Sequence, residues 1–165
     1  NKAFTLTRVL DVPRDLVWDA WTQETHLKQW FGPKGTAIVQ CRMDLRPGGI
    51  FHYGMRMPDG KVMWGKWTFR EIDAPKNLVV VVSFSDKAGG VTRHPFAPGW
   101  PLETLSTTTF TDDGGKTRID LVWEAINATP EEIALFAGSH AGMTQGWNGT
   151  FAQLSAYLDA LKGES

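Results

Sequence analysis

His140 is the residue of this chain that the sequence places best for chemistry. It begins a stretch in which apolar side chains recur at spacings of three and four, so on a helix its imidazole shares one face with them. The members of this apolar stripe are Met143, Trp147, Phe151, Leu154 and Leu158. An imidazole on such a face can bind the polar end of a ligand or transfer a proton. The alternative is a histidine near the start of the helix that is partly exposed or bonded to a backbone carbonyl.

His94 is the second candidate, because it lies in a connection that is longer than a hairpin needs. Residues 86–101 carry this histidine together with Arg93, Trp100 and three prolines. Long loops in compact domains often act as lids or binding loops, and we expect Trp100 at the rim of an opening. Prolines also stiffen surface loops. The segment can therefore be interpreted either as a lid over a binding site or as a rigid surface loop without a role in binding.

No motif for a metal, a nucleotide or a covalent intermediate accompanies these histidines. The sequence has no GxxxxGK[ST] loop, HExxH, GxSxG or CxxC, and no cluster of His, Asp and Glu with the spacing of metal ligands. We therefore expect no metal and no cofactor. The predicted apolar faces carry almost no paired ionisable groups, so the sequence favours binding over general acid–base catalysis.

Composition narrows the class of protein further. Lys and Arg number 17 and Asp and Glu 18, without a long block of either sign, which argues against nucleic acid as a partner. The single Cys41 cannot form an internal disulfide, and no segment approaches the ~20 apolar residues that span a bilayer. The first ten residues alternate polar and apolar, unlike a signal peptide. We expect a cytoplasmic protein whose residues 1–165 form a single domain.

The elements that must position these side chains follow from periodicity and turn chemistry. Alternation over residues 4–10 predicts a strand, and helical spacing predicts two short helices, the first over 13–21 and the second capped by Thr25 and ended by Gly32-Pro33. Period-two patterns separated by Gly, Pro, Asn and Asp turns then predict six more strands, near 36–45, 49–57, 61–72, 77–86, 102–112 and 116–126.

The last third of the chain predicts helix. Thr129 can cap a helix that has Pro130 at its first position and Glu132 at its third, where a capping box closes. Gly138 is expected to break or bend the helical stretch after it, and the main helix should run from about residue 139 to 161, with Gly163 ending it.

One face of the predicted antiparallel meander is apolar and aromatic. Alternation places on this face Phe51, Tyr53, Met55, Met57, Met63, Trp67, Phe69, Ile119, Leu121 and Trp123. The opposite face carries His52, which we expect in water. The apolar run from Leu78 to Val82 does not reveal which side faces inward. A sheet of this kind folded around the long helix tends to leave a pocket between the two.

Several local motifs resemble those of one known family, in the same order along nearly the whole chain. They are Val12-Pro13 through Trp21, Leu27-Lys28-Gln29-Trp30-Phe31-Gly32-Pro33, Asp44-Leu45-Arg46-Pro47-Gly48-Gly49, Pro58-Asp59-Gly60, Gly65 through Ile72, and Gly142-Met143 with Gly146-Trp147. The chain resembles the helix-grip (START-like, Bet v 1-like) superfamily, also called SRPBCC. Within it, the chain is similar to the activator of heat-shock-protein-90 ATPase homologue family, often labelled polyketide cyclase-like. The resemblance implies an α+β fold in which a seven-stranded antiparallel sheet wraps around a long C-terminal helix, with two short helices between strands 1 and 2, enclosing a hydrophobic cavity.

Our first functional hypothesis is the binding of a hydrophobic or aromatic small molecule between the sheet and the C-terminal helix. The expected ligand-binding residues are Phe51, Tyr53, Met55, Met63, Trp67, Phe69, Trp100, His140, Met143, Trp147 and Phe151, with Tyr53, His94 and His140 as polar handles. The aromatic members of this set also have the simpler interpretation of core packing. One alternative is a cyclase- or hydrolase-like enzyme that uses His140 or His94 as its base. The other is a domain that co-regulates heat-shock protein 90, and a homodimer formed through an exposed strand edge also stays open.

Overall fold

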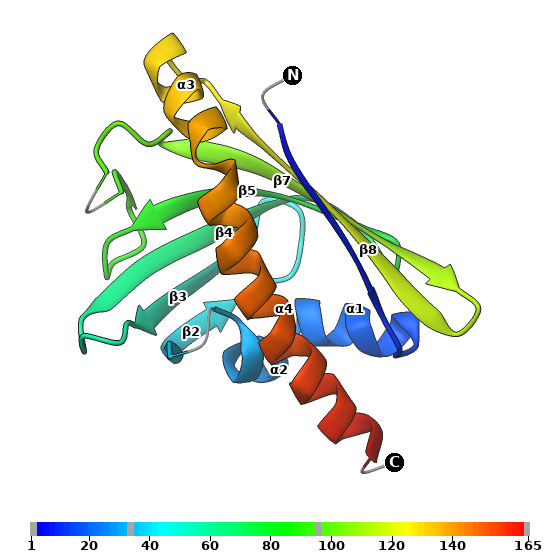
Figure 1. Ribbon diagram of the computed structural model, residues 1–165. Helices are drawn as coiled ribbons and strands as arrows, with labels where there is room; N and C mark the ends of the chain where they lie inside the picture. The colour runs from blue at the N-terminus through cyan, green and yellow to red at the C-terminus, as the bar shows by residue number, and fades with distance from the viewer. Residues whose placement is uncertain (1–2, 33–34, 95–96, 164–165) are drawn as a thin grey trace.

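A single antiparallel sheet wraps around the C-terminal helix in the computed structural model, which describes residues 3–32, 35–94 and 97–163. The strands are β1 (Phe4–Leu10), β2 (Ala37–Met43), β3 (Ile50–Arg56), β4 (Val62–Asp73), β5 (Asn77–Ser85), β6 (Val91–Thr92), β7 (Glu103–Asp113) and β8 (Lys116–Ile126). The helices are α1 (Arg14–Thr22), α2 (Glu24–Trp30), α3 (Pro130–Gly138) and α4 (His140–Gly163). The spatial order of the strands in the sheet is β1-β8-β7-β5-β4-β3-β2, with β6 beside β5. Figure 1 shows α4 crossing the concave face of this sheet, with α1 and α2 at one end and α3 at the other.

This architecture confirms the predicted helix-grip fold and the two short helices between the first two strands. The structure adds one strand inside the predicted long loop, the two-residue β6, which pairs with Phe84 and Ser85 of β5. It forms because the chain reverses tightly at Gly89, whose φ of 97° suits glycine, and the Asp86 N–H donates to the Gly90 carbonyl at 3.0 Å. The sheet therefore has eight strands where seven were predicted.

The two short helices meet at one residue. The N–H of Gln23 donates to the Asp19 carbonyl at 3.1 Å, which closes α1, while its own carbonyl accepts from Leu27 N at 2.9 Å and opens α2. The prediction that Thr25 caps the second helix is wrong, because the chain turns at Gln23 and Thr25 already lies inside the first turn. The helix ends at Trp30, and Pro33 lies outside the described residues.

The capping box predicted at the start of α3 is confirmed. Thr129 Oγ1 accepts from the Glu132 N–H at 3.1 Å, and Glu132 Oε1 accepts from the Thr129 N–H at 3.0 Å. This helix ends at Gly138, and α4 begins at His140, as the expected break at the glycine predicted.

The densest part of the core lies where α1, α2 and α4 cover the sheet. Trp30, Leu154 and Leu158 are at most 1% exposed, and the Trp30 indole N–H donates to the Ala20 carbonyl at 2.9 Å, which joins α2 to α1. On the outer face, the expectation that His52 lies in water is wrong. Its ring stacks on Trp64 with centroids 5.2 Å apart, and its Nε2 lies 3.0 Å from the Asp86 carbonyl, so a neighbouring aromatic and a loop bury it.

Candidate functional site

A cavity of about 250 Å³ lies beyond the dense core, where strands β3, β4, β5, β7 and β8 meet the loop between β6 and β7. Its walls are formed by Tyr53, Met55, Met57, Met63, Trp64, Gly65, Val82, Ser83, Phe84, His94, Trp100, Pro101, Leu102, Thr104 and Trp123. Leu102 is 37% exposed, so the cavity reaches the surface at the loop. Most of these side chains are apolar, as in sites that bind small organic molecules.

Three methionines supply much of the apolar wall. Met55 and Met63 stand opposite each other in the β3–β4 register, and Met57 follows two residues after Met55 on the same face. Methionine is unbranched and polarisable, so it adapts to ligands of different outline. This part of the wall can therefore accommodate more than one shape.

Tyr53 enters the cavity because its neighbour across the ladder is a glycine. It pairs with Gly65, where an added Cβ would lie only 2.5 Å from the tyrosine hydroxyl oxygen. Any side chain at position 65 would therefore displace the ring. Burial raises the pKa of Tyr53, so the hydroxyl stays neutral and can serve as a hydrogen-bonding group for a ligand.

His94 is held in the cavity wall by aromatic contacts and one backbone hydrogen bond. Its ring centroid lies 4.5 Å from that of Phe84 and 6.2 Å from that of Trp100. The Ala97 N–H donates to its Nδ1 at 3.1 Å, which requires this nitrogen to be unprotonated. Burial lowers the pKa of His94 below its ordinary value of 6.5, which also favours the neutral ring.

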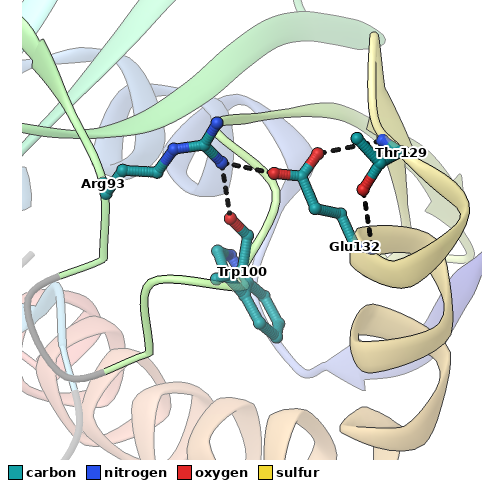
Figure 2. A network of polar contacts seen from close by, with 4 residues as sticks. All are labelled: Arg93, Trp100, Thr129 and Glu132. Carbon is teal, nitrogen blue, oxygen red and sulfur yellow. Dashed lines mark hydrogen bonds and ion pairs between the residues drawn. The ribbon is translucent and has the colours of Figure 1, made fainter.

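A polar network ties this loop to the start of α3 (Figure 2). One Arg93 guanidinium nitrogen donates both to a carboxylate oxygen of Glu132 and, at 3.3 Å, to the Trp100 carbonyl. The other carboxylate oxygen of Glu132 closes the capping box with Thr129. The backbone N–H of Thr129, and then Arg93, hold the pKa of Glu132 below its ordinary value. One carboxylate thus fixes the end of a helix and the loop that covers the cavity.

Beneath α4, where the pocket was predicted, the helix packs almost flush on the sheet. The void there is only about 10 Å³, scarcely room for one water. The Trp147 ring fills this space, because it stacks on Trp21 with centroids 6.2 Å apart and planes 7° from parallel. The larger cavity is displaced from the predicted position, and α4 supplies none of its described wall residues.

The residues proposed from sequence therefore separate into three groups. Tyr53, Met55, Met63, His94 and Trp100 come together in the cavity wall. Trp67 and Trp147 line the small void, and Phe51, Phe69 and Phe151 belong to the dense core. Met143 packs against the smaller core cluster of Phe4, Leu121 and Phe136.

His140 lies in neither cavity wall. Its ring makes edge contacts with Phe4 and Phe136, at centroid distances of 5.6 and 5.4 Å. Its Nε2 is buried and has no hydrogen-bond partner among the residues that the structure describes. The helical spacing placed this histidine on the correct apolar face but not at the cavity, which lies farther out over the sheet.

Several wall residues were not predicted as site residues. Met57 and Trp123 lie inside predicted strands, and alternation had already placed both on the apolar face, so that pattern could have marked them as site residues. Val82 was hidden in the uniformly apolar run of β5, and Phe84 follows it on the same face. Leu102 directly precedes β7 and Thr104 is the second residue of that strand, and no signal in the sequence marks them.

A family match accompanies this geometry. The model of the activator of Hsp90 ATPase homolog 1-like protein family matches residues 11–159. The chain belongs to this family. Membership implies a ligand-binding fold, without indicating the ligand. No curated protein matches the chain.

Solved structures of proteins from several bacteria share the fold over nearly the whole chain. A crystal structure of a protein from Nitrosomonas europaea is 29% identical with a TM-score of 0.77, and the match covers 98% of this chain and 96% of that one. A protein from Mycobacterium smegmatis is 24% identical with a TM-score of 0.76, covering 93% and 88%. A solution structure from Arthrobacter aurescens is 24% identical with a TM-score of 0.77, covering 96% and 86%. The two at 24% identity support the fold alone.

Two features are absent from the described residues: a cluster of metal ligands and a helix that could span a membrane. No group of three or more His, Cys, Asp or Glu side chains there is arranged to hold a metal ion. None of the described helices is long and apolar enough to cross a membrane.

Proposed function

We propose that this protein binds a hydrophobic or aromatic small molecule in the cavity between the sheet and the loop residues His94, Trp100, Pro101 and Leu102. The observation that carries the proposal is the cavity itself, about 250 Å³ with largely apolar walls that reach the surface at Leu102. Pockets for drug-sized ligands span roughly 300–1,000 Å³, so a molecule of one or two rings suits this one. Tyr53, Met55, Met63, His94 and Trp100 are the predicted site residues that would contact it.

The composition of the wall supports binding more than turnover. Among the described wall residues, Tyr53 and His94 are the side chains that carry a titratable group, and none is a carboxylate. The raised pKa of Tyr53 keeps its hydroxyl protonated, and Nδ1 of His94 already accepts a hydrogen bond from Ala97. General acid–base catalysis needs an acid and a base within hydrogen-bond reach of the substrate, and this wall offers a poor pair.

Native mass spectrometry of freshly purified protein, followed by a thermal-shift screen of small aromatic compounds, tests the proposal. A ligand that binds only the folded state raises the melting temperature in proportion to its occupancy. We expect a co-purifying apolar mass or at least one compound that stabilises the protein. A broad screen in which no compound does so, together with a ligand-free mass spectrum, would contradict the proposal.

A matched pair of variants on β5 locates the binding. Val82 lines the cavity, whereas Val79 points to the opposite face of the same strand, by alternation. Val82→Phe should narrow the cavity and reduce the shift caused by a stabilising compound, and Val79→Phe should leave that shift unchanged. Equal responses from the two variants would place the compound elsewhere.

A further inference from the structure

Trp123 lies between the proposed binding cavity and the small void beneath α4. This β8 residue lines the cavity of about 250 Å³ and also the void of about 10 Å³ beneath α4. Its indole Nε1 is buried, and within the described part of the chain it has no hydrogen-bond partner. A donor without an acceptor therefore lies in the wall of the proposed binding site.

A buried donor of this kind calls for an explanation, because nearly all buried polar groups in folded proteins are paired. The indole N–H can only donate, so it cannot be satisfied by another donor. The ring of Trp147 lies edge-on to it, with centroids 5.9 Å apart and planes at 84°, and a ring face is at best a weak acceptor. The N–H makes no hydrogen bond to a described residue. Rotation of the indole toward the larger cavity therefore breaks no hydrogen bond.

The other polar groups of the wall limit what the acceptor can be. No Lys or Arg is among the described wall residues, so a carboxylate or phosphate would enter without a counter-charge. Burying an unpaired charge is far more costly than burying a neutral oxygen that accepts one hydrogen bond. The wall thus suits a neutral acceptor such as a ketone, ester or ether oxygen.

We propose that the ligand is a neutral, largely apolar molecule carrying one hydrogen-bond acceptor, and that the Trp123 indole N–H binds this acceptor. The apolar part of the ligand lies against Met55 and Met63, so Trp123 fixes its orientation. This inference rests on the proposed function, because it concerns the ligand of the same cavity. It excludes fatty acids and other anions as preferred ligands.

Three probes of nearly equal shape test the inference on the whole chain. They are 2-acetylnaphthalene, a ketone; 2-isopropenylnaphthalene, in which a CH₂ group replaces the ketone oxygen; and 2-naphthoate, which is anionic. We expect the ketone to bind roughly tenfold more tightly than the alkene, the gain typical of one hydrogen bond, and naphthoate to bind more weakly than the ketone.

The indole N–H resonances provide a direct readout. Among the eight tryptophans, the signal of Trp123 is identified by its loss in Trp123→Phe. The ketone should move this signal downfield and the alkene should not. In Trp123→Phe both probes should still bind, with their affinities brought close together. If this variant does not fold, sequential assignment of the wild-type spectrum identifies the Trp123 signal instead, and its shift with the ketone still decides the matter.

Each of the other possible outcomes would overturn a specific part of the inference. If the ketone and the alkene bind equally and shift the Trp123 signal by the same amount, Trp123 does not bind the acceptor. The proposal of an apolar binding cavity is then unaffected. A ketone preference that persists in Trp123→Phe also excludes Trp123 as the group that binds the acceptor. Naphthoate binding as tightly as the ketone overturns the neutral ligand class. If no probe binds and neither the cavity methionines nor Trp123 responds, the proposed function fails, and this inference fails with it.

Discussion

The two ends of the concave sheet are covered in different ways, and the difference explains where the hollow lies. At one end three helices cover the strands, and Trp30, Leu154 and Leu158 are almost completely buried. At the other end the cover comes from the described loop residues 93–94 and 97–102, held to the start of α3 by Arg93 and Glu132. Helices bring apolar side chains at regular spacing and fill the space beneath them. A loop brings fewer such side chains, and a cavity remains.

The comparison also separates two uses of aromatic residues. In the packed end the ring of Trp21 contacts those of Phe110 and Phe151, and all three occupy the interior. At the cavity end Tyr53 and Trp100 form walls around unfilled space. The same residue types therefore stabilise the fold at one end and create a binding surface at the other.

The largest expected difference between the two ends concerns stability. Leu154→Ala removes a fully buried side chain under α4 and should lower the free energy of unfolding by about 2–5 kcal/mol. Met63→Ala at the cavity should cost only about 1 kcal/mol, because this half-buried side chain already borders empty space. Urea denaturation of both variants measures the contrast. Equal losses of unfolding free energy in the two variants would show that the cavity end is packed as tightly as the helix-covered end.

The next effect concerns the mobility of the loop. Arg93→Ala removes the tie to Glu132 and Trp100, so amide hydrogen exchange at residues 97–102 should accelerate, by at most about fivefold for a partly exposed ion pair. Arg118→Ala is the matched control, because its ion pair with Asp120 lies on β8 and does not touch the loop. If both variants leave exchange in the loop unchanged, the polar network does not hold it.

A pH effect follows from His94. Burial lowers its pKa in the folded state, so between that folded value and 6.5 the unfolded chain binds the proton more readily. The full stability is present above pH 6.5 and falls as pH decreases from there through the folded pKa, because protonation also removes the acceptor for Ala97. Glu132, with its lowered pKa, stays charged over this interval.

Thermal unfolding between about pH 5 and 7 measures this dependence. His94→Asn is the control, since its amide oxygen can accept from the Ala97 N–H but does not titrate. The slope assigned to His94 should be absent in this variant. A slope of unchanged size would mean that another group is responsible.

The smallest expected effect is a gain in stability on α4. Gly142 lies within this helix, is exposed, and a Cβ added there meets nothing within 4 Å. Gly142→Ala should raise the free energy of unfolding by up to about 1 kcal/mol and leave ligand binding unchanged. Chemical denaturation and the thermal-shift assay measure the two quantities. A loss of binding would show that the open space at this position serves the ligand.

The sequence predicts the elements well because each carries a local signal. Period-two alternation located the strands to within about two residues, and the capping box at Thr129 and Glu132 marked the start of α3. Tyr53, Met55 and Met63 were placed on the correct face for the same reason. These predictions needed no knowledge of contacts between distant segments.

The position of the cavity depends on such contacts and could not be predicted. The spacing of Trp147 and His140 identifies a helix face, but not the part of the sheet that each residue covers. Trp147 fills the expected pocket because Trp21, far away in the chain, stacks against it. His52 is buried by Trp64 and the loop at Asp86, which alternation alone does not reveal.

The five methionines allow the most direct test of the central claim, that the loop-covered end of the sheet binds an apolar ligand. Met55, Met57 and Met63 line the cavity, whereas Met43 and Met143 lie outside its walls and serve as internal controls. In spectra of protein labelled at the methionine methyl groups, a bound aromatic compound should shift the first three signals and leave the other two unchanged. Shifts confined to Met43 or Met143, or no shift with any compound that binds, would contradict this account.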